Sequence, residues 1–334
     1  MNSRFFSPLG TVSCVTLGGG GIGNVWGETN REEAVATVRA AVDGGITLLD
    51  MAPSYGRGEA ESVIGEAFGG QLPAGVRVTT KCQLGTPEDI AAVHPRLEKS
   101  LRRSLDTMGL ECADIFFLHS NICPDDYRYA QFPDSQDRWA TCWTLYQQGA
   151  VPAMQRLVEQ GLCRFWGITG TGLPSTIREA LMAEAAPDAV QLTANLMDSA
   201  GNICLFDSEP ESPRESIAVA RERGIGVMGI RAVAAGSLCA VIDRDLPETE
   251  MTVVDYRRAA GFRELCASIG EDPADIAHRY ALGMAGVDTV VLGVKNRSEL
   301  AACLAAAAAG PLDTALVQRI DALGLQQGQA HQHE

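Results

Sequence analysis

The sequence predicts an α/β protein, with residues 1–334 forming one domain built around a closed barrel of eight strand–helix units. Strand-like apolar runs alternate with helix-like runs along the whole chain, and no linker divides its 334 residues. The strand-like runs are continuously apolar, which is typical of a parallel sheet covered by helices. Eight such units in a chain of this length indicate a (β/α)₈, or TIM, barrel.

The expected elements follow one another in strict alternation. The strands are Val12–Leu17, Thr47–Asp50, Val76–Lys81, Asp114–His119, Arg164–Thr169, Ala189–Thr193, Gly226–Ile230 and Thr289–Leu292. The helices are Arg31–Asp43, Ala60–Phe68, Arg96–Met108, Val151–Gln160, Pro174–Ala185, Ser212–Arg223, Tyr256–Ile269 with Pro273–Met284, and Ser298–Ala308. Thr29 or Asn30 can cap the first helix, and Gly44 with Gly45 can end it.

Two segments are longer than barrel connections require. Residues 121–149 follow the fourth strand, and residues 231–255 follow the seventh. Loops that follow barrel strands line the active-site face, so we expect both segments there as lids or substrate walls. Residues 121–149 carry six aromatic residues, for which packing onto the barrel is the alternative: Tyr127, Tyr129, Phe132, Trp139, Trp143 and Tyr146.

Composition excludes several classes of protein. The net charge of −15 and the pI of about 4.8 oppose binding to nucleic acid or anionic membranes. We find neither an apolar run long enough to span a membrane nor a secretory signal. The ten cysteines are scattered without a C-x-x-C pair, which indicates reduced thiols in a cytoplasmic protein. Residues 325–334, with His331 and His333, are expected to be a frayed tail with too few ligands for a metal site.

Ionisable residues stand at the ends of three expected strands. Asp50 ends the second strand, Lys81 the third and His119 the fourth, while Tyr55 follows Asp50 by five residues. In a barrel these strand ends meet at one face, so the four side chains are expected to lie together. Each alone is more often structural, because a strand-end Asp–Lys pair or a single histidine is common. Together they suit proton transfer to or from a carbonyl oxygen.

At this point the chain resembles the aldo-keto reductases over nearly its whole length. The resemblance rests on the run from Gly45 to Gly56, on Glu59-Ala60-Glu61-Ser62-Val63-Ile64-Gly65, and on Lys81 and His119 at the next two strand ends. It implies a (β/α)₈ barrel that binds NADP(H), or NAD(H), in extended form. It also implies Tyr55 as general acid, Lys81 lowering the pKa of Tyr55, Asp50 holding Lys81, and His119 orienting the carbonyl.

The same resemblance implies a set of cofactor contacts. Thr169 and Gln191 occupy the positions that hold the carboxamide, with Asn195 nearby, while Gly170 stands where the family has asparagine. The segment Ala234-Ala235-Gly236-Ser237-Leu238 resembles the pyrophosphate loop. The aromatic residue that usually covers the nicotinamide is replaced by Ile230 with Arg231 beside it, and either could cover the ring.

The adenosine-phosphate segment is expected at Gly293, Lys295, Arg297 and Glu299. Lys295 and Arg297 could bind a 2′-phosphate, whereas the Glu299 carboxylate would repel it, and a solvated helix start is the alternative. We expect NADP(H), with NAD(H) as the other possibility.

The run Gly18-Gly19-Gly20-Gly21-Ile22-Gly23 fits the G-x-G-x-x-G pattern of a Rossmann phosphate loop. A Rossmann fold also needs an acidic residue at the end of the next strand, about 20 residues further on. The sequence has no such strand-ending residue at that distance, so we expect a flexible loop at the barrel mouth instead. Trp26, Tyr55, His119 and Trp139 are the expected substrate contacts.

The expected function is NAD(P)(H)-dependent interconversion of a carbonyl compound, aldoses included, and its alcohol or lactone. The substrate partner would be a small carbonyl compound or sugar. Two alternatives stay open, a lyase that forms a Schiff base on Lys81 and a regulatory barrel that binds NADPH without catalysis.

Overall fold

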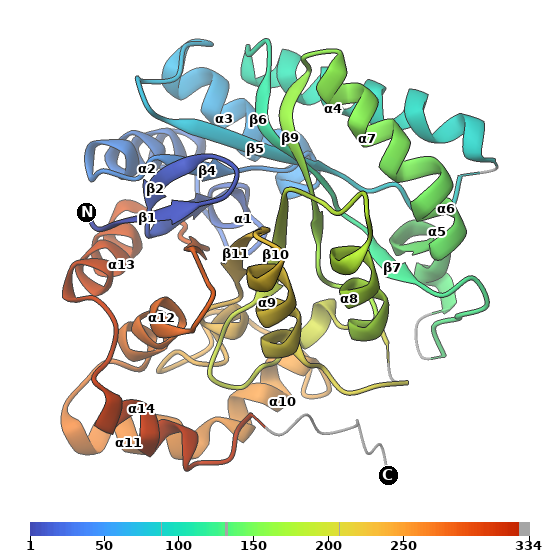
Figure 1. Ribbon diagram of the computed structural model, residues 1–334. Helices are drawn as coiled ribbons and strands as arrows, with labels where there is room; N and C mark the ends of the chain where they lie inside the picture. The colour runs from blue at the N-terminus through green and yellow to red at the C-terminus, as the bar shows by residue number, and fades with distance from the viewer. Residues whose placement is uncertain (88, 131–132, 207, 327–334) are drawn as a thin grey trace.

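The computed structural model describes residues 1–87, 89–130, 133–206 and 208–326. Eight parallel strands close into one barrel with the helices around the outside (Figure 1). In chain order the barrel strands are β3 (Val15–Gly18), β4 (Leu48–Asp50), β5 (Arg77–Cys82), β6 (Ala113–Leu118), β9 (Cys163–Thr169), β10 (Ala189–Thr193), β11 (Gly226–Ile230) and β12 (Thr289–Leu292). Each strand pairs with the next in sequence, and β12 pairs with β3, so the predicted (β/α)₈ barrel is confirmed.

The helices fill the connections between these strands. They are α1 (Gly19–Ile22), α2 (Arg31–Asp43), α3 (Glu59–Phe68), α4 (Val93–Met108), α5 (Gln136–Trp139), α6 (Trp143–Leu145), α7 (Val151–Glu159), α8 (Pro174–Met182), α9 (Pro213–Glu222), α10 (Met251–Arg258), α11 (Ala260–Ile269), α12 (Pro273–Gly283), α13 (Arg297–Ala309) and α14 (Thr314–Asp321). Short 3₁₀ or π turns are η1 (Tyr55–Gly58), η2 (Ile90–Ala92), η3 (Pro133–Ser135), η4 (Tyr146–Ala150), η5 (Gly201–Ile203) and η6 (Ala234–Gly236).

An N-terminal hairpin plugs one end of the barrel. It consists of β1 (Ser3–Phe6) and β2 (Gly10–Ser13), which pair antiparallel. Phe6, Leu9 and Val12 of this hairpin pack against inward-facing strand residues such as Phe117 and Met228. This apolar plug leaves the opposite end, where the strands finish, as the mouth.

The predicted bounds of the first strand were wrong. The run Val12–Leu17 is divided between the hairpin strand β2 and the barrel strand β3. The Ser13 Oγ accepts a hydrogen bond from Thr47 N and donates one to Val15 O, which marks the turn between them. An apolar run can therefore serve two sheets, because its periodicity does not show where the chain changes direction.

The prediction of a flexible loop at the glycine-rich stretch was also wrong. Gly19–Ile22 forms the short helix α1, and all four residues are buried. A Cβ on Gly21 would stand 2.0 Å from Val294 O, so the backbones of the first and last barrel connections touch here. These glycines are needed for close packing rather than for flexibility.

The two long connections lie where the sequence places them, but they contain more structure than expected. Within residues 121–149, β7 (Asn121–Cys123) pairs in parallel with β8 (Ala140–Cys142). Tyr127, Tyr129 and Trp139 pack in a small cluster with residues of these strands, while Trp143 and Tyr146 pack against the main core. Phe132 falls outside the described residues. The connection after β11 ends earlier than expected because α10 begins at Met251, and a break at Ala259 separates α10 from α11.

Several other boundaries refine the expected ones. Asn30 is the cap of α2 and accepts a hydrogen bond from Glu33 N, while Thr29 donates to Lys295 O instead. The expected tail starts with two residues that are held: Arg258 donates to Leu325 O, and Gln326 donates to the hydroxyl of Tyr280. Residues 327–334, including His331 and His333, lie outside the described residues.

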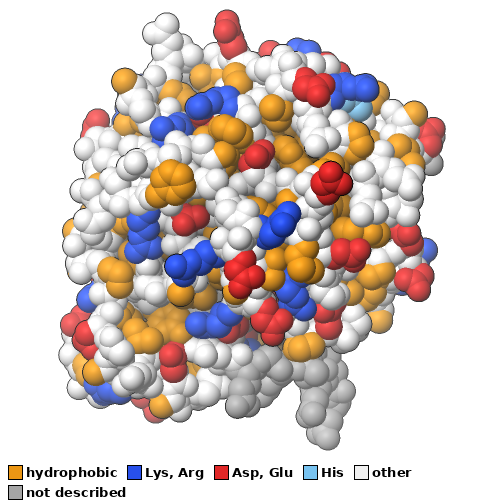
Figure 2. Space-filling model, in the orientation of Figure 1, with side chains coloured by type: hydrophobic (Ala, Val, Ile, Leu, Met, Phe, Trp, Pro, Cys, Tyr) orange, Lys and Arg blue, Asp and Glu red, His pale blue; other side chains and the backbone are white. Residues whose placement is uncertain are grey.

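Acidic and basic side chains are interspersed over the face shown in Figure 2, with scattered apolar ones between them. Among the described residues, we find no single helix with the length and apolar character to cross a membrane, although the sharply bent pair α13 and α14 passes that test as a pair.

Candidate active site

Four ionisable side chains meet at the carboxyl ends of consecutive barrel strands. Asp50 is the last residue of β4, Lys81 lies near the end of β5, and His119 directly follows β6. Tyr55 begins η1, the turn that leads from β4 into α3. The structure thus brings together the four residues that the sequence proposed as catalytic.

Asp50 and Lys81 form a buried ion pair. Lys81 Nζ lies 2.7 Å from Asp50 Oδ2 and donates a second hydrogen bond of 2.9 Å to Met51 O. The Asp50 Oδ1 accepts from Thr79 Oγ1 at 2.5 Å and from Gln191 Nε2 at 2.7 Å. A buried charge persists when its partners are complete, and here both carboxylate oxygens and the ammonium are satisfied. The Lys81 ammonium is therefore held in one position.

Tyr55 lies against this ammonium. Lys81 Nζ is 4.8 Å from the centre of the Tyr55 ring. Burial raises the pKa of Tyr55, the positive charge of Lys81 lowers it, and the net direction is upward. The effect of Lys81 has the predicted sign, but in the protein without ligands burial outweighs it. The phenol therefore keeps its proton at neutral pH and is available as an acid.

The Lys81 ammonium also keeps its charge. Burial lowers its pKa, but the carboxylate of Asp50 and the Tyr55 hydroxyl raise it, and the net direction is upward. A protonated lysine supplies a fixed positive charge beside the phenol, and it is a poor nucleophile.

His119 forms the next wall of the mouth. Its ring lies 6.3 Å from that of Tyr55 and 6.0 Å from that of Trp139, both edge to face. Burial, followed by the charge of Lys81, lowers its pKa to about 3. The imidazole is therefore neutral at physiological pH and can donate a hydrogen bond without carrying charge. Trp139, another expected substrate residue, stands beside it.

The expected carboxamide positions are held by other contacts in this structure. Thr169 is buried, with its Oγ1 3.3 Å from Leu118 O, and Gln191 is engaged by Asp50. The Asn195 amide donates to Ser199 O and to Arg231 O, which ties two mouth loops together. A side chain at Gly170 would clash, because a Cβ there would stand 2.3 Å from Leu192 Cδ2.

The expected pyrophosphate loop has an unusual backbone. Ala234, Ala235 and Gly236 have φ angles of 46°, 54° and 102°, a left-handed run that costs energy for the two alanines. Successive residues of this kind often cluster where a backbone approaches an anion. The side chain of Ser237, however, donates to Thr252 O, and Leu238 is buried in the core. The backbone N–H groups of Ser237 and Leu238 also donate within the turn, to Ala234 O and Val233 O.

Arg231 is the most unusual residue of the mouth. Its φ is 65°, and its three guanidinium nitrogens are buried without a hydrogen-bond partner among the described residues. Burial lowers its pKa to about 10, against the raising effect of Asp255 and Glu211. An unsatisfied buried guanidinium costs free energy, which a phosphate or another oxygen-rich ligand would recover. Ile230 precedes it as the last residue of β11.

The expected adenosine end is rich in ion pairs. Lys295 Nζ contacts Asp243 and lies 2.9 Å from Glu299 Oε1, while Arg297 binds both carboxylate oxygens of Glu33. Gly293 lies under the ring of Trp26, since a Cβ there would stand 3.3 Å from Trp26 Cδ1. Both expected phosphate-binding cations are thus matched by carboxylates of the protein.

Four residues of the site escaped the sequence analysis. Thr79 could have been found, because it lies two positions before Lys81 in a strand and so shares its inward face. Asp243 and Arg244 belong to the long connection after β11, and Glu33 to α2. Spacing alone does not show which cation each of these charged residues meets.

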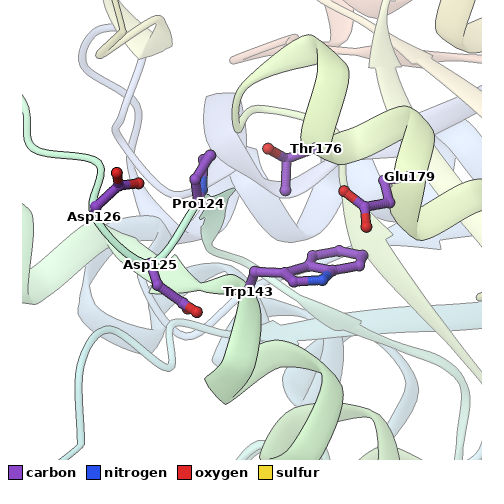
Figure 3. Close-up of a pocket in the computed structure, with 6 residues that line it drawn as sticks. All are labelled: Pro124, Asp125, Asp126, Trp143, Thr176 and Glu179. Atoms are coloured by element: carbon purple, nitrogen blue, oxygen red, sulfur yellow. The ribbon is translucent and has the colours of Figure 1, made fainter.

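A separate hollow lies away from these residues. It measures about 320 Å³ and is lined by Pro124, Asp125, Asp126, Trp143, Thr176 and Glu179. Figure 3 shows the Trp143 indole facing Thr176 and Glu179 of α8. Asp125 is occupied there by the backbone and hydroxyl of Thr144. None of the four catalytic candidates lines this hollow, so we place the chemistry at the barrel mouth. Among the described residues we also find no cluster of three or more metal-ligating side chains.

A family model now decides the relationship. The model of the aldo/keto reductase family matches residues 15–324, which include all eight barrel strands. The chain belongs to the aldo/keto reductase family. Among curated relatives of this family member, the L-galactose dehydrogenase of Arabidopsis thaliana is 25% identical over 320 residues, which cover 95% of this chain and 88% of that protein.

Solved structures give the same fold. The aldo-keto reductase AKR11C1 of Bacillus halodurans, in its holo form, superposes with a TM-score of 0.71 at 20% identity, covering 100% of this chain and 98% of that one. An aldo-keto reductase of Klebsiella pneumoniae in complex with NADPH gives a TM-score of 0.68 at 18% identity, covering 100% of this chain and 99% of that one. At these identities the likeness shows the barrel and its connections.

Proposed function

We propose that this aldo/keto reductase interconverts an aldehyde or ketone and the corresponding alcohol by hydride transfer, with Tyr55 as general acid and base. The observation that carries the proposal is the Asp50–Lys81 pair beside Tyr55, with His119 on the other side of the phenol. A protonated phenol, a fixed ammonium and a neutral imidazole are the groups that a carbonyl oxygen needs as it gains electron density.

Each residue has a distinct task in this proposal. Tyr55 gives its proton to the carbonyl oxygen in reduction and takes it back in oxidation. Lys81 stabilises the phenolate that remains, and Asp50 holds Lys81 through the 2.7 Å ion pair. His119 donates a hydrogen bond that orients the carbonyl, and its lowered pKa keeps it uncharged while it does so.

A nicotinamide dinucleotide would supply the hydride when bound. The buried guanidinium of Arg231, which lacks a hydrogen-bond partner among the described residues, fits an anionic pyrophosphate. We propose NADP(H), the cofactor in the Klebsiella complex, with NAD(H) as the alternative that the carboxylates around Lys295 and Arg297 support.

The substrate class that we propose is a small carbonyl compound, with aldoses among the candidates. The name of the Arabidopsis relative, a sugar dehydrogenase, supports aldoses, as does a mouth lined by Trp139 and His119. Aromatic rings stack on the apolar faces of sugars, and charged rims hold their hydroxyl groups.

The Schiff-base alternative receives no support from Lys81. A lysine attacks a carbonyl only as the neutral amine, and Asp50 together with Tyr55 raises the pKa of Lys81. A regulatory barrel without turnover remains the second candidate, since Arg231 could serve nucleotide binding alone.

The test is an assay of the purified protein with a panel of aldehydes, ketones and aldoses, with NADPH and NADH in turn, beside Tyr55→Phe. We expect turnover in at least one pair and a loss of about 100-fold or more in the variant, with cofactor affinity retained. Tight nucleotide binding without turnover on any substrate would favour the regulatory barrel. Equal turnover in the variant would remove Tyr55 from its role.

A further inference from the structure

The ring of Trp26 lies where the cofactor is proposed to run. A Cβ on Gly293 would be 3.3 Å from Trp26 Cδ1, and a Cβ on Gly20 would be 2.3 Å from Trp26 Nε1. The ring thus rests on the backbone of the first and last barrel connections. Gly293 was expected to contact the nucleotide. In this structure the Trp26 ring lies over Gly293, so the ring and the nucleotide cannot both occupy that position.

Two arginines hold this ring from the connection after β11. The guanidinium carbon of Arg231 is 5.7 Å from the centre of the Trp26 ring, and that of Arg244 is 5.9 Å away. Arg244 is itself anchored, because it donates a 2.6 Å hydrogen bond to Ala235 O in the expected pyrophosphate loop. Cation–π contacts of this kind stabilise the ring in its present position. Trp26 therefore contacts Arg231 directly and is linked through Arg244 to the expected pyrophosphate loop.

The segment that carries Trp26 is built to turn at two points. Asn24 has a φ of 61° and Gly27 a φ of 124°, on either side of the tryptophan. Among the described residues, the hydrogen bonds of the segment 24–29 reach only short connections: Asn24 N donates to Gly21 O, Val25 N to Gly20 O, Thr29 N to Asn24 Oδ1, and Thr29 Oγ1 to Lys295 O. Rotation at these two residues would lift the ring without disturbing a barrel strand.

We infer that Trp26 is a gate that competes with the dinucleotide for the positions beside Arg231, Arg244 and Gly293. With the gate closed, the ring lies against Arg231 and over Gly293. With the gate open, the buried nitrogens of Arg231 become available to the ligand. The inference rests on the proposed nucleotide site, and it adds that binding is limited by the opening of the segment 24–29.

The gate predicts a distinctive binding rate. A protein that binds only in a minor open state has its apparent affinity reduced by the open fraction. Stopped-flow mixing with NADPH, followed by nicotinamide fluorescence, should therefore give an observed rate that levels off with concentration in the unmodified protein. Trp26→Ala should give a rate that rises linearly, with affinity tightened about tenfold. Arg244→Met should lie between the two, and Trp143→Phe, which alters the separate hollow, serves as the matched control.

The opposite results are equally clear. Weaker binding by Trp26→Ala would mean that the ring holds the bound nucleotide rather than excluding it, and would overturn the gate. The same concentration dependence in all variants would also overturn it. If neither NADPH nor NADH bound to any variant, the proposed function would fail, and the gate with it. Trp26→Phe keeps a ring and provides an intermediate expectation should the alanine variant not fold.

Discussion

The side-chain amide of Gln191 donates a 2.7 Å hydrogen bond to Oδ1 of Asp50, from β10 to β4 across the barrel. The same oxygen accepts from Thr79, so the carboxylate is fixed on both sides while its other oxygen binds Lys81. Gln191, expected to hold the cofactor, thus also orients the carboxylate that holds the Lys81 ammonium.

Gln191→Met should therefore damage turnover more than cofactor binding. The change leaves Asp50 one hydrogen bond short in a buried site and loosens Lys81. We expect kcat to fall about tenfold or more, while the dissociation constant of the nucleotide rises about threefold or less. Steady-state kinetics and fluorescence titration measure the two effects. A loss confined to nucleotide affinity would show that Gln191 serves the carboxamide alone.

The protonation of His119 gives a second prediction. Its pKa of about 3 means that it stays neutral from mildly acid to alkaline pH. The pH profile of kcat/KM for reduction should therefore lack a step near 6.5, the ordinary pKa of histidine. A step between pH 6 and 7 that disappears in His119→Asn would contradict the neutral imidazole.

Glu211 gives a prediction about stability. Burial raises its pKa to about 7, and its Oε2 accepts a hydrogen bond from Ala200 N. Between its ordinary pKa and 7 the native state binds more protons than the unfolded state, so the contribution of Glu211 to stability falls as pH rises through that range. Glu211→Gln should therefore raise the melting temperature by about 2 °C or more at pH 8 and change it less at pH 5.

The matched control for this change is Glu222→Gln, at the exposed end of α9. It should leave the melting temperature nearly unchanged at both pH values. An equal gain for Glu211→Gln at pH 5 and pH 8 would show that ionisation of Glu211 is not the cause.

The ion pairs at the adenosine end predict how cofactor preference can be changed. Asp243 contacts Lys295, so a 2′-phosphate must compete with this carboxylate for the ammonium. Asp243→Asn should tighten NADPH binding about threefold to tenfold and leave NADH binding nearly unchanged. Lys295→Ala should weaken NADPH more than NADH.

Asp245→Asn, two residues further along the same connection, tests whether a general change in charge is enough. It should have little effect on either dissociation constant. If Asp243→Asn and Asp245→Asn shifted NADPH binding alike, the contact between Asp243 and Lys295 would not be the determinant.

The barrel, and the meeting of the candidate residues at one end of it, could be predicted from the sequence for a simple physical reason. Continuous apolar strands specify a sheet buried on both faces, and parallel strands bring Asp50, Lys81 and His119 to one end. The division of the first strand at Ser13 could not be predicted, because an apolar residue suits the hairpin plug and the barrel equally well.

The contacts between loops also could not be predicted from the sequence. Trp26 was expected to line the substrate pocket, and its contacts with Arg231 and Arg244 depend on where three connections meet. Glu33 lies on α2, far along the chain from Arg297, and meets it only because α13 packs beside α2. Periodicity specifies which face of an element is apolar, not which charged tips of distant elements meet.

The most direct test of the account follows the hydride itself. The protein is incubated with NADPH or NADH carrying deuterium at the transferable position and with a carbonyl substrate found in the panel, and the product is examined by mass spectrometry. We expect deuterium on the former carbonyl carbon, with formation slowed about 100-fold or more in Tyr55→Phe. An unlabelled product, or labelling at the same rate in the variant, would contradict hydride transfer with Tyr55 as the acid.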